Sequence, residues 1–317
     1  MSCNRPLPAW RNKTPNDNGR YGVTFRFAEA DTSRKLEIPC GRCTGCRLER
    51  ARAWAVRMCH EAKLYRHNYF ITLTYNEASL PRTVQGLPTL RPEDFTLFMK
   101  RLRKYRETQW GGAPAPSPYP LTQDKETPTD KRIRYYQCGE YGETTNRPHH
   151  HAILFNCYLP DLKPIRLTRA RNAHTLYESA RLAKIWTNGM VSVGQVTFET
   201  AAYVAAYVTK KITGTPAAQH YNGRVPEYST MSRRPGIGAA FHAKYAEEIW
   251  ASDSVIIRGH EMRPPKFYDR TLERTDPELY YEIRDQRANT PKHIAKHRER
   301  EAKEVTSTQQ LRKRDAT

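Results

Sequence analysis

The sequence predicts an α+β fold in which an antiparallel sheet carries helices on one face. Three observations support this prediction: segments rich in aromatic and β-branched residues, amphipathic segments with helical periodicity, and a short connection with the residue types of a hairpin turn. Their order along the chain indicates strand, helix, strand, strand, helix, strand, helix. This order is that of a split βαβ arrangement, which gives an antiparallel sheet.

The first elements are predicted between residues 48 and 106. Apolar residues follow a helical stripe from Leu48 onward, after a polar segment, residues 1–40, that has only weak periodicity. The aromatic and β-branched run at 69–75 indicates a buried strand. Pro92 suits the first position of a second helix, because the missing N–H would have no partner inside the helix.

The remaining sheet is predicted around a hairpin. Strands at 132–138 and 149–155 flank a short connection that contains glycine, asparagine and proline, and a Pro-rich loop at 111–130 precedes them. The elements that follow are a helix near 171–186, a strand near 190–197 and a helix that begins at about residue 199. Beyond Asp276 the chain is charged and poor in apolar residues, which indicates either a solvated helix or a disordered basic tail.

We expect three parts in the chain. Residues 1–66 form a Cys-rich segment with a basic helix, residues 67–215 form the sheet core, and residues 216–317 form a C-terminal extension with a charged tail. A chain of 317 residues is long enough to bury a sizeable core as one large domain or two.

The charge balance predicts a polyanionic partner. Lys and Arg number 53 against 33 Asp and Glu, which gives a formal net charge of +20 at pH 7. Each phosphate that a Lys or Arg neutralises releases condensed counterions, which favours nucleic acid as the partner. The basic residues selected as candidate DNA contacts are Arg50, Arg57, Arg101, Lys104 and Lys211.

Composition argues against a membrane protein and against a secreted one. The mean hydropathy is −0.83, and no apolar run approaches the ~20 residues that a span needs. The N-terminal segment has no apolar signal-peptide core. Seven cysteines, an odd and clustered set, fit a reducing compartment better than a disulfide framework. We therefore expect a soluble cytoplasmic protein.

Two histidines of the predicted hairpin form a candidate metal clamp. Because side chains alternate along a strand, His149 and His151 project from one face while His150 points away. An ion such as Mg²⁺ or Mn²⁺ needs a further oxygen ligand. Glu140 lies nine residues upstream of His149, where a hairpin brings it alongside, whereas Glu143 falls in the turn. We favour Glu140 as the third ligand.

Two tyrosines four residues apart, Tyr203 and Tyr207, share one face of the last core helix and form a pair of candidate nucleophiles. A phenol with a pKa of ~10 needs a cation or a metal-bound phosphate nearby to react at neutral pH. Lys210 lies on nearly the same helical face and can supply that cation. The plain alternative is an aromatic packing pair. Small apolar residues beside the tyrosines already provide a packing stripe, which favours the functional interpretation.

The spacing Cys40-x2-Cys43-x2-Cys46 predicts a structural zinc site. The candidates for a fourth ligand are Cys3, Cys59 and His60. The same run also occurs in iron–sulfur proteins, and unligated cytosolic thiols are the remaining alternative.

At these residues the chain resembles the HUH endonuclease superfamily, and specifically the two-tyrosine rolling-circle replication initiators of gokushovirus-like microviruses. The run at 70–74 resembles the first strand motif of that superfamily. Residues 148–151 are similar to its His-hydrophobic-His motif, except that His150 takes the usually hydrophobic middle place. The segment Tyr203-x3-Tyr207-x2-Lys210 resembles its two-tyrosine motif. The resemblance covers about residues 65–215 and implies an RRM-like HUH core.

The resemblance implies an enzyme of phage rolling-circle replication that acts in the cytoplasm of a bacterial host. One tyrosine attacks the scissile phosphate of single-stranded origin DNA and leaves a 5′-phosphotyrosine and a free 3′-hydroxyl. A host DNA polymerase extends that 3′-hydroxyl, together with a host helicase. The other tyrosine then cleaves the regenerated junction, and the released 3′-hydroxyl closes a single-stranded circle. The resemblance does not imply which tyrosine acts first.

Two alternatives stay open at this point. A plasmid relaxase or single-strand transposase shares the active-site plan, although mobilisation relaxases usually carry further histidines and a tyrosine near the N-terminus, which this chain lacks. A non-catalytic zinc-containing DNA-binding or packaging protein would explain the charge and the cysteines. It would not explain the ordered His and Tyr motifs.

Overall fold

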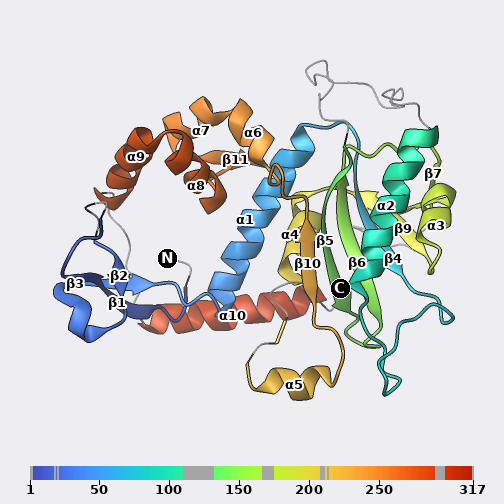
Figure 1. The fold of residues 1–317 in the computed structure, drawn as a ribbon, viewed down its shortest axis with the longest axis horizontal. Helices are drawn as coiled ribbons and strands as arrows, with labels where there is room; N and C mark the ends of the chain where they lie inside the picture. The colour runs from blue at the N-terminus through green and yellow to red at the C-terminus, as the bar shows by residue number, and fades with distance from the viewer. Residues whose placement is uncertain are drawn as a thin grey trace. The chain divides into compact units, whose positions relative to one another are not determined.

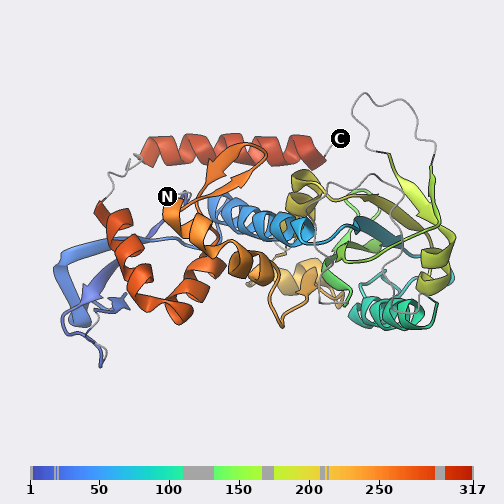
Figure 2. The same ribbon diagram turned by 90° about the horizontal axis from the view of Figure 1, so that it is seen from above.

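A computed structural model describes most of the chain (Figures 1 and 2). The described residues are 3–17, 19, 21–109, 132–165, 175–207, 211–212, 214–289 and 297–315. The predicted Pro-rich loop at 111–130 and Lys210 lie outside them. The chain divides into two compact units, which are Met1–Arg50 with Gln286–Thr317, and Ala51–Asp285. The division into three parts that we expect from the sequence stays a prediction.

The larger unit, Ala51–Asp285, contains a seven-stranded sheet in which all neighbouring strands are antiparallel. Its strand order is β10-β5-β6-β4-β9-β8-β7, counted over the described residues. The strands are β4 (Asn68–Thr74), β5 (Arg134–Tyr141), β6 (Pro148–Phe155), β7 (Leu162–Pro164), β8 (Tyr177–Ser179), β9 (Val191–Gln195) and β10 (Tyr228–Met231). The predicted α+β fold with an antiparallel sheet is confirmed. The central order β5-β6-β4-β9 is that of a split βαβ unit.

Helices flank both faces of this sheet (Figure 1). The two crossover helices, α2 (Pro92–Gln109) and α3 (Ala180–Trp186), pack on one face, as the sequence predicts. Their buried side chains, such as Phe98 and Trp186, meet the side chains of alternate strand residues, such as Leu73. The opposite face is covered by α1 (Thr44–Lys63) and α4 (Phe198–Tyr207), which the one-face prediction did not include.

The C-terminal part of the larger unit packs against α1. Its elements are α5 (Pro216–Tyr221), α6 (Ala239–Lys244), α7 (Ala246–Ser252), β11 (Val255–Ile257), β12 (His260–Met262), α8 (Lys266–Thr275) and α9 (Pro277–Asn289). Val56 of α1 lies in one apolar cluster with Trp250 and Tyr268. A buried ion pair between Glu61 of α1 and Arg134 joins α1 to β5, so this helix connects the sheet to the C-terminal elements.

The smaller unit contains a three-stranded antiparallel sheet that the sequence did not predict. The strands are β1 (Leu7–Asn12), β2 (Val23–Thr24) and β3 (Ala30–Ile38), in the order β2-β1-β3. Most of their side chains are at least half exposed, so the hydrophobic alternation that reveals a strand is absent. The solvated-helix alternative for the C-terminal segment is confirmed by α10 (His297–Asp315), from which Arg300 forms an ion pair with Glu37 of β3.

A second difference concerns the predicted helix near 171–186. Residues Tyr177–Ser179 are strand β8, and α3 begins only at Ala180. The hydroxyl of Ser179 accepts a hydrogen bond from the Leu182 amide at 3.1 Å, which caps the helix at that point. No helix in the described part of the chain combines the length and the apolar character needed to cross a membrane.

Candidate functional site

The hairpin of β5 and β6 sets the register of the candidate metal ligands. Glu140 lies directly opposite His149, and Cys138 lies opposite His151. On the other side of β6, Thr72 of β4 is the partner of His151. Because successive side chains alternate between faces, the Glu140, His149 and His151 side chains share the face that α1 and α4 cover.

These three side chains converge on one point. The Glu140 Oε1 atom lies 2.5 Å from His149 Nε2 and 2.9 Å from His151 Nε2. One ligand atom from each residue lies within 4.8 Å of the others. Glu140 is buried, whereas Glu143 is an exposed residue of the turn between the strands. The structure therefore brings Glu140, and not Glu143, to the histidines.

The outer nitrogens of the two rings are held by neighbouring oxygen atoms. His149 Nδ1 lies 3.1 Å from the Arg147 carbonyl oxygen, so this nitrogen carries the proton and donates it. His151 Nδ1 lies 2.9 Å from Thr72 Oγ1. Such contacts fix the orientation of an imidazole and leave Nε2 to act as a ligand.

The protonation states suit a divalent cation. Burial raises the pKa of Glu140, but hydrogen bonds with His149 and His151 outweigh it and leave the pKa below its ordinary value. The carboxylate is therefore ionised at neutral pH. Burial lowers the pKa of His151, which favours the neutral ring that can bind a metal.

One atom of this group lacks a partner. Glu140 Oε2 is buried, and no described residue forms a hydrogen bond with it. An ionised oxygen that is buried without a partner is costly, and a bound cation removes that cost. One carboxylate and two neutral imidazoles also form a donor set that Mg²⁺ or Mn²⁺ accepts when water completes the coordination. The residues therefore fit a divalent metal.

Tyr203 lies beside this group. Its hydroxyl is 3.5 Å from His151 Nε2, and its ring lies edge-on to those of His151 and Phe70. The side chain is 42% exposed, so a substrate can reach the hydroxyl. Ala201, Val204 and Ala205 of α4 are buried against the sheet, as the apolar stripe predicts. This packing places Tyr203 at the edge of the buried helix face.

Two other predicted residues of the tyrosine motif cannot be located in the same way. Tyr207 is the last residue of α4, and its side chain lies outside the described residues, as does the whole of Lys210. Lys211 is described and half-buried.

His150 lies on the opposite face and belongs to a separate polar cluster that the sequence did not reveal. His150 Nε2 lies 3.0 Å from the hydroxyl of Tyr75, which donates to Asp94 Oδ2 at 2.9 Å. His150 Nδ1 lies 3.4 Å from the Tyr228 hydroxyl. The alternation of the strand already placed His150 away from its neighbours, and a buried imidazole needs partners. No short-range pattern identifies those partners.

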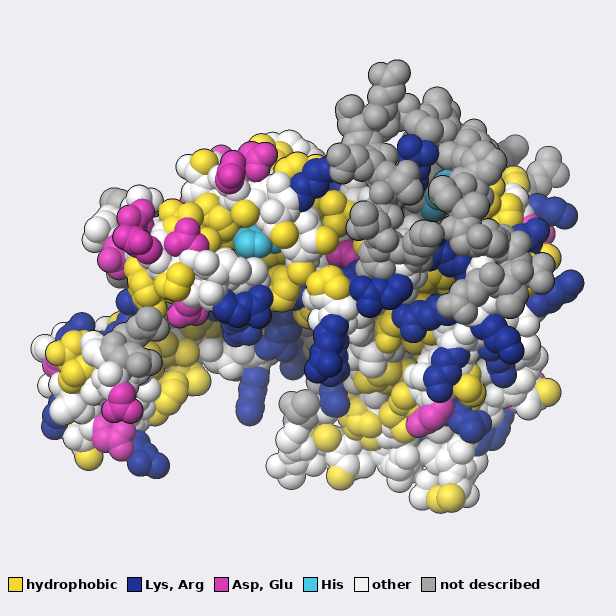
Figure 3. Space-filling view, turned by 45° about the horizontal axis from the view of Figure 1, so that its top comes forward, with side chains coloured by type: hydrophobic (Ala, Val, Ile, Leu, Met, Phe, Trp, Pro, Cys, Tyr) yellow, Lys and Arg dark blue, Asp and Glu magenta, His cyan; other side chains and the backbone are white. Residues whose placement is uncertain are grey.

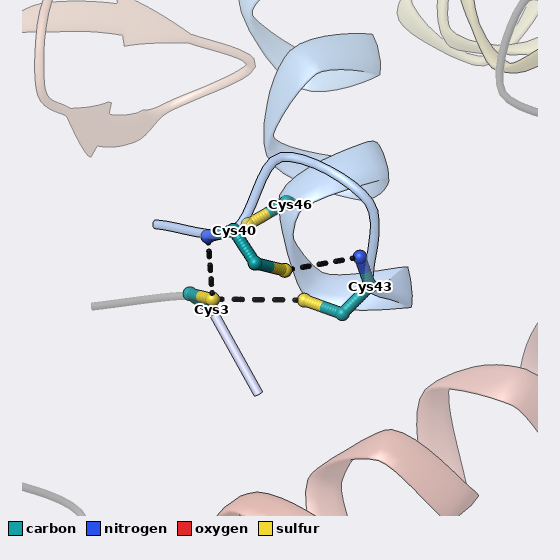
Figure 4. A group of neighbouring side chains, drawn as sticks. All are labelled: Cys3, Cys40, Cys43 and Cys46. Carbon is teal, nitrogen blue, oxygen red and sulfur yellow. Dashed lines mark hydrogen bonds between the residues drawn. The ribbon is translucent and has the colours of Figure 1, made fainter. Parts of the chain in front are cut away.

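The predicted cysteine cluster is present in the smaller unit (Figure 4). Cys3, Cys40, Cys43 and Cys46 each offer a sulfur, and the four sulfurs lie within 4.8 Å of one another. Cys3 therefore takes the fourth position. The other two candidates for that position, Cys59 and His60, are wrong, because both lie in the larger unit; His60 there forms a 2.8 Å hydrogen bond with Tyr268.

Several of the predicted basic contacts are held by the protein itself. The Arg57 guanidinium lies between the rings of Trp54 and Phe267 and donates to the Ile237 carbonyl at 2.9 Å. Arg101 of α2 contacts Thr187 at 3.2 Å on the crossover-helix face. The remaining candidates are Arg50, Lys104 and Lys211. Lys and Arg side chains spread over much of the surface in Figure 3, and the DNA-binding roles of all five residues stay predictions.

Comparison with known proteins places this site in a family. A family model of the replication-associated protein ORF2 matches residues 68–212, which include the hairpin and α4. The chain is 30% identical to replication-associated protein ORF2 of Spiroplasma virus 4 over 298 residues, which cover 89% of this chain and 83% of the relative. It is 29% identical over 289 residues to replication-associated protein VP4 of Bdellovibrio phage phiMH2K, with 89% and 80% of the two chains covered.

A third relative, replication-associated protein ORF4 of Chlamydia phage 1, is 26% identical over 240 residues, which cover 74% of this chain and 53% of the relative. No solved structure matches the chain significantly. The sheet, its hairpin and the matched relatives define a phage replication-associated protein. The chain belongs to the family of microvirus replication initiators.

Proposed function

We propose that the protein initiates rolling-circle replication by nicking and joining single-stranded origin DNA through tyrosine. The observation that carries this proposal is the position of the Tyr203 hydroxyl, 3.5 Å from a nitrogen that itself lies 2.9 Å from Glu140. A potential nucleophile and a potential metal site thus share one place on the sheet. An aromatic residue that served only packing would not need its hydroxyl there.

Glu140, His149 and His151 would hold a divalent cation such as Mg²⁺ or Mn²⁺. When bound, the cation would polarise the scissile phosphate and offset the charge that develops on its oxygens. Arg147 and Thr72 support the two imidazoles from behind, so the ligands are oriented before the metal arrives.

In the proposed reaction, the Tyr203 oxygen forms a bond to phosphorus as the bond to the 3′-oxygen breaks. The phenol proton is lost, and the departing 3′-oxygen takes up a proton to become a hydroxyl. The energy of the broken phosphodiester is retained in the 5′-phosphotyrosine, so rejoining needs no nucleotide cofactor. Tyr207 would provide the second nucleophile after one round of synthesis, and Lys210 would stabilise the developing charge.

The proposal includes the setting of the reaction. Single-stranded origin DNA is the substrate, and the basic surface contributes affinity through phosphate contacts. A host helicase and a host DNA polymerase act on the nicked strand in the cytoplasm of the bacterial host.

The test is a covalent-adduct assay. The protein is incubated with Mn²⁺ and single-stranded oligonucleotides that tile the genome encoding it, and denaturing gels reveal a DNA-bound band. We expect one oligonucleotide to give an adduct. Tyr203→Phe combined with Tyr207→Phe should remove the adduct, while each single change should leave nicking but impair circle formation.

Other outcomes would point to the alternatives. Binding without an adduct on any oligonucleotide would indicate a non-catalytic DNA-binding or packaging protein. Cleavage without attachment would indicate a nuclease that uses water. An adduct that persists in the double tyrosine variant would show that the nucleophile is assigned wrongly.

A further inference from the structure

The four cysteines of the smaller unit have the spacing of a single metal ion's ligands. Cys3 Sγ lies 3.8 Å from Cys43 Sγ, and all four sulfurs lie within 4.8 Å of one another. A tetrahedral zinc with bonds of ~2.3 Å separates its sulfur ligands by about 3.8 Å. An iron–sulfur cluster attaches its cysteines to different irons and therefore spreads them further apart. The compact arrangement favours one ion.

Backbone amides support the sulfurs from the outside (Figure 4). The amide of Cys43 donates to Cys40 Sγ, and the amide of Cys40 donates to Cys3 Sγ, each at 3.3 Å. The amide of Asn4 donates to Cys43 Sγ, also at 3.3 Å. An ionised sulfur accepts such hydrogen bonds better than a thiol does, and it is the ionised form that binds metal.

The smaller unit lacks an ordinary hydrophobic core. Among its described residues, the buried apolar side chains are Cys3, Ala9, Ala30, Cys43 and Cys46. Two alanine methyl groups and three cysteines bury little apolar surface. Units with so small a core are usually stabilised by a disulfide, a metal or a partner. The four clustered cysteines are free thiols in this structure.

The cluster also closes this unit along the chain. Cys3 precedes β1, and Cys40 follows β3, so a bond that joins them fixes both ends of the three-stranded sheet. Cys43 immediately precedes α1, and Cys46 lies in its first turn. One ion would therefore tie the N-terminal segment, the end of the sheet and the start of the helix together.

We propose that Cys3, Cys40, Cys43 and Cys46 bind one structural Zn²⁺, which stabilises the smaller unit in place of a hydrophobic core. Four thiolates in a closed tetrahedral set favour zinc over Mg²⁺ or Mn²⁺, which prefer oxygen ligands. Binding releases the protons of the cysteines, and folding of the unit is coupled to it. This site is independent of the proposed DNA chemistry, because none of its residues belongs to the carboxylate–imidazole group.

The test measures metal content in full-length protein purified without chelator. The variant that carries both His149→Ala and His151→Ala is used, so that the other metal site does not contribute. We expect about one zinc per chain by mass spectrometry of the metal. Replacement by Co²⁺ should give the intense near-ultraviolet absorption of sulfur-to-cobalt charge transfer, which an oxygen and nitrogen site does not give.

The matched substitutions are Cys46→Ala and Cys59→Ser in the same background. Cys46→Ala should lower the zinc content at least tenfold and speed proteolysis within residues 4–39, whereas Cys59→Ser should leave both unchanged. Because Cys46→Ala can fail to fold, the same proteolysis is followed in chelator-treated protein without that change. Iron with visible absorption, or no metal and four thiols that react rapidly in the folded protein, would overturn the proposal.

Discussion

Three consecutive histidines of β6 have two different roles in this structure. His149 and His151 point to one face, where both Nε2 atoms lie within hydrogen-bonding distance of Glu140. His150 points to the other face, where its nitrogens lie near the hydroxyls of Tyr75 and Tyr228. Residue type is the same at all three positions, so the face of the strand decides the chemistry.

The two environments differ in whether their polar groups are complete. Both ring nitrogens of His150 have hydroxyl partners, and the ring is fully buried. On the other face, Glu140 Oε2 has no partner among the described residues, and the His149 side chain is 18% exposed. A complete polar cluster stabilises the core, whereas an incomplete one that solvent can reach is able to bind a ligand.

The largest expected effect tests the assignment of the first face. His149→Ala should lower cleavage of origin DNA about 100-fold or more, because it removes one of three protein ligands from the metal. Salt-sensitive DNA binding should change little, since phosphate contacts supply it. Rates of nicking and filter-binding affinities at two salt concentrations measure the two quantities. Equal losses in both would contradict the metal assignment.

The second prediction concerns metal-dependent stability. Mn²⁺ at about 100 times its Kd should raise the free energy of unfolding by about 2.7 kcal/mol, because it binds the folded state. Thermal unfolding with and without Mn²⁺ measures the effect in the wild type, in His149→Ala and in His150→Leu. Only His149→Ala should lose the stabilisation. The assignment of faces is wrong if His150→Leu loses it as well.

The third prediction tests the opposite face. His150→Leu should destabilise the protein by about 1–3 kcal/mol, because the hydroxyls of Tyr75 and Tyr228 lose a partner inside the core. Nicking should stay within a few-fold of the wild type at a temperature where the variant is folded. Urea unfolding gives the stability, and the adduct assay gives the activity. A stable but inactive variant would show that His150 acts in the reaction.

The smallest expected effect is a pH dependence. Burial lowers the pKa of His150 to about 3, below its ordinary value of 6.5. Between these values the unfolded chain binds a proton that the folded chain does not, so stability falls as the pH falls through this window. This group contributes a slope of up to about 1.4 kcal/mol per pH unit.

His150→Leu should remove that contribution. Urea unfolding of metal-free protein at several pH values between 7 and 4.5 measures the slope for the variant and the wild type. Parallel curves would mean that His150 does not remain neutral in the folded state.

The sequence was sufficient for features that depend on local pattern. The order of the central strands followed from their periodicity, and the approach of Glu140 to His149 followed from a short hairpin, because a turn of that kind fixes the register. The clustering of Cys40, Cys43 and Cys46 likewise followed from their spacing.

Features that depend on distant segments could not be predicted. Tyr228 reaches His150 because β10 joins the edge of the sheet beside β5, and nothing near either residue in the sequence specifies that pairing. The same holds for Arg57, whose charge suggested a DNA contact although its guanidinium packs between two rings. The sheet of the smaller unit was missed because it buries too few apolar side chains to produce a pattern.

The most direct test of the proposed function identifies the residue that carries DNA. The covalent adduct is digested with nuclease and protease, and the peptides are sequenced by mass spectrometry. We predict a nucleotide 5′-phosphate on Tyr203 or Tyr207, with Tyr203 carrying it when Tyr207 is changed to Phe. A nucleotide on any other residue, or on none, would contradict the assignment of the tyrosine beside the Glu140 and histidine group as the nucleophile.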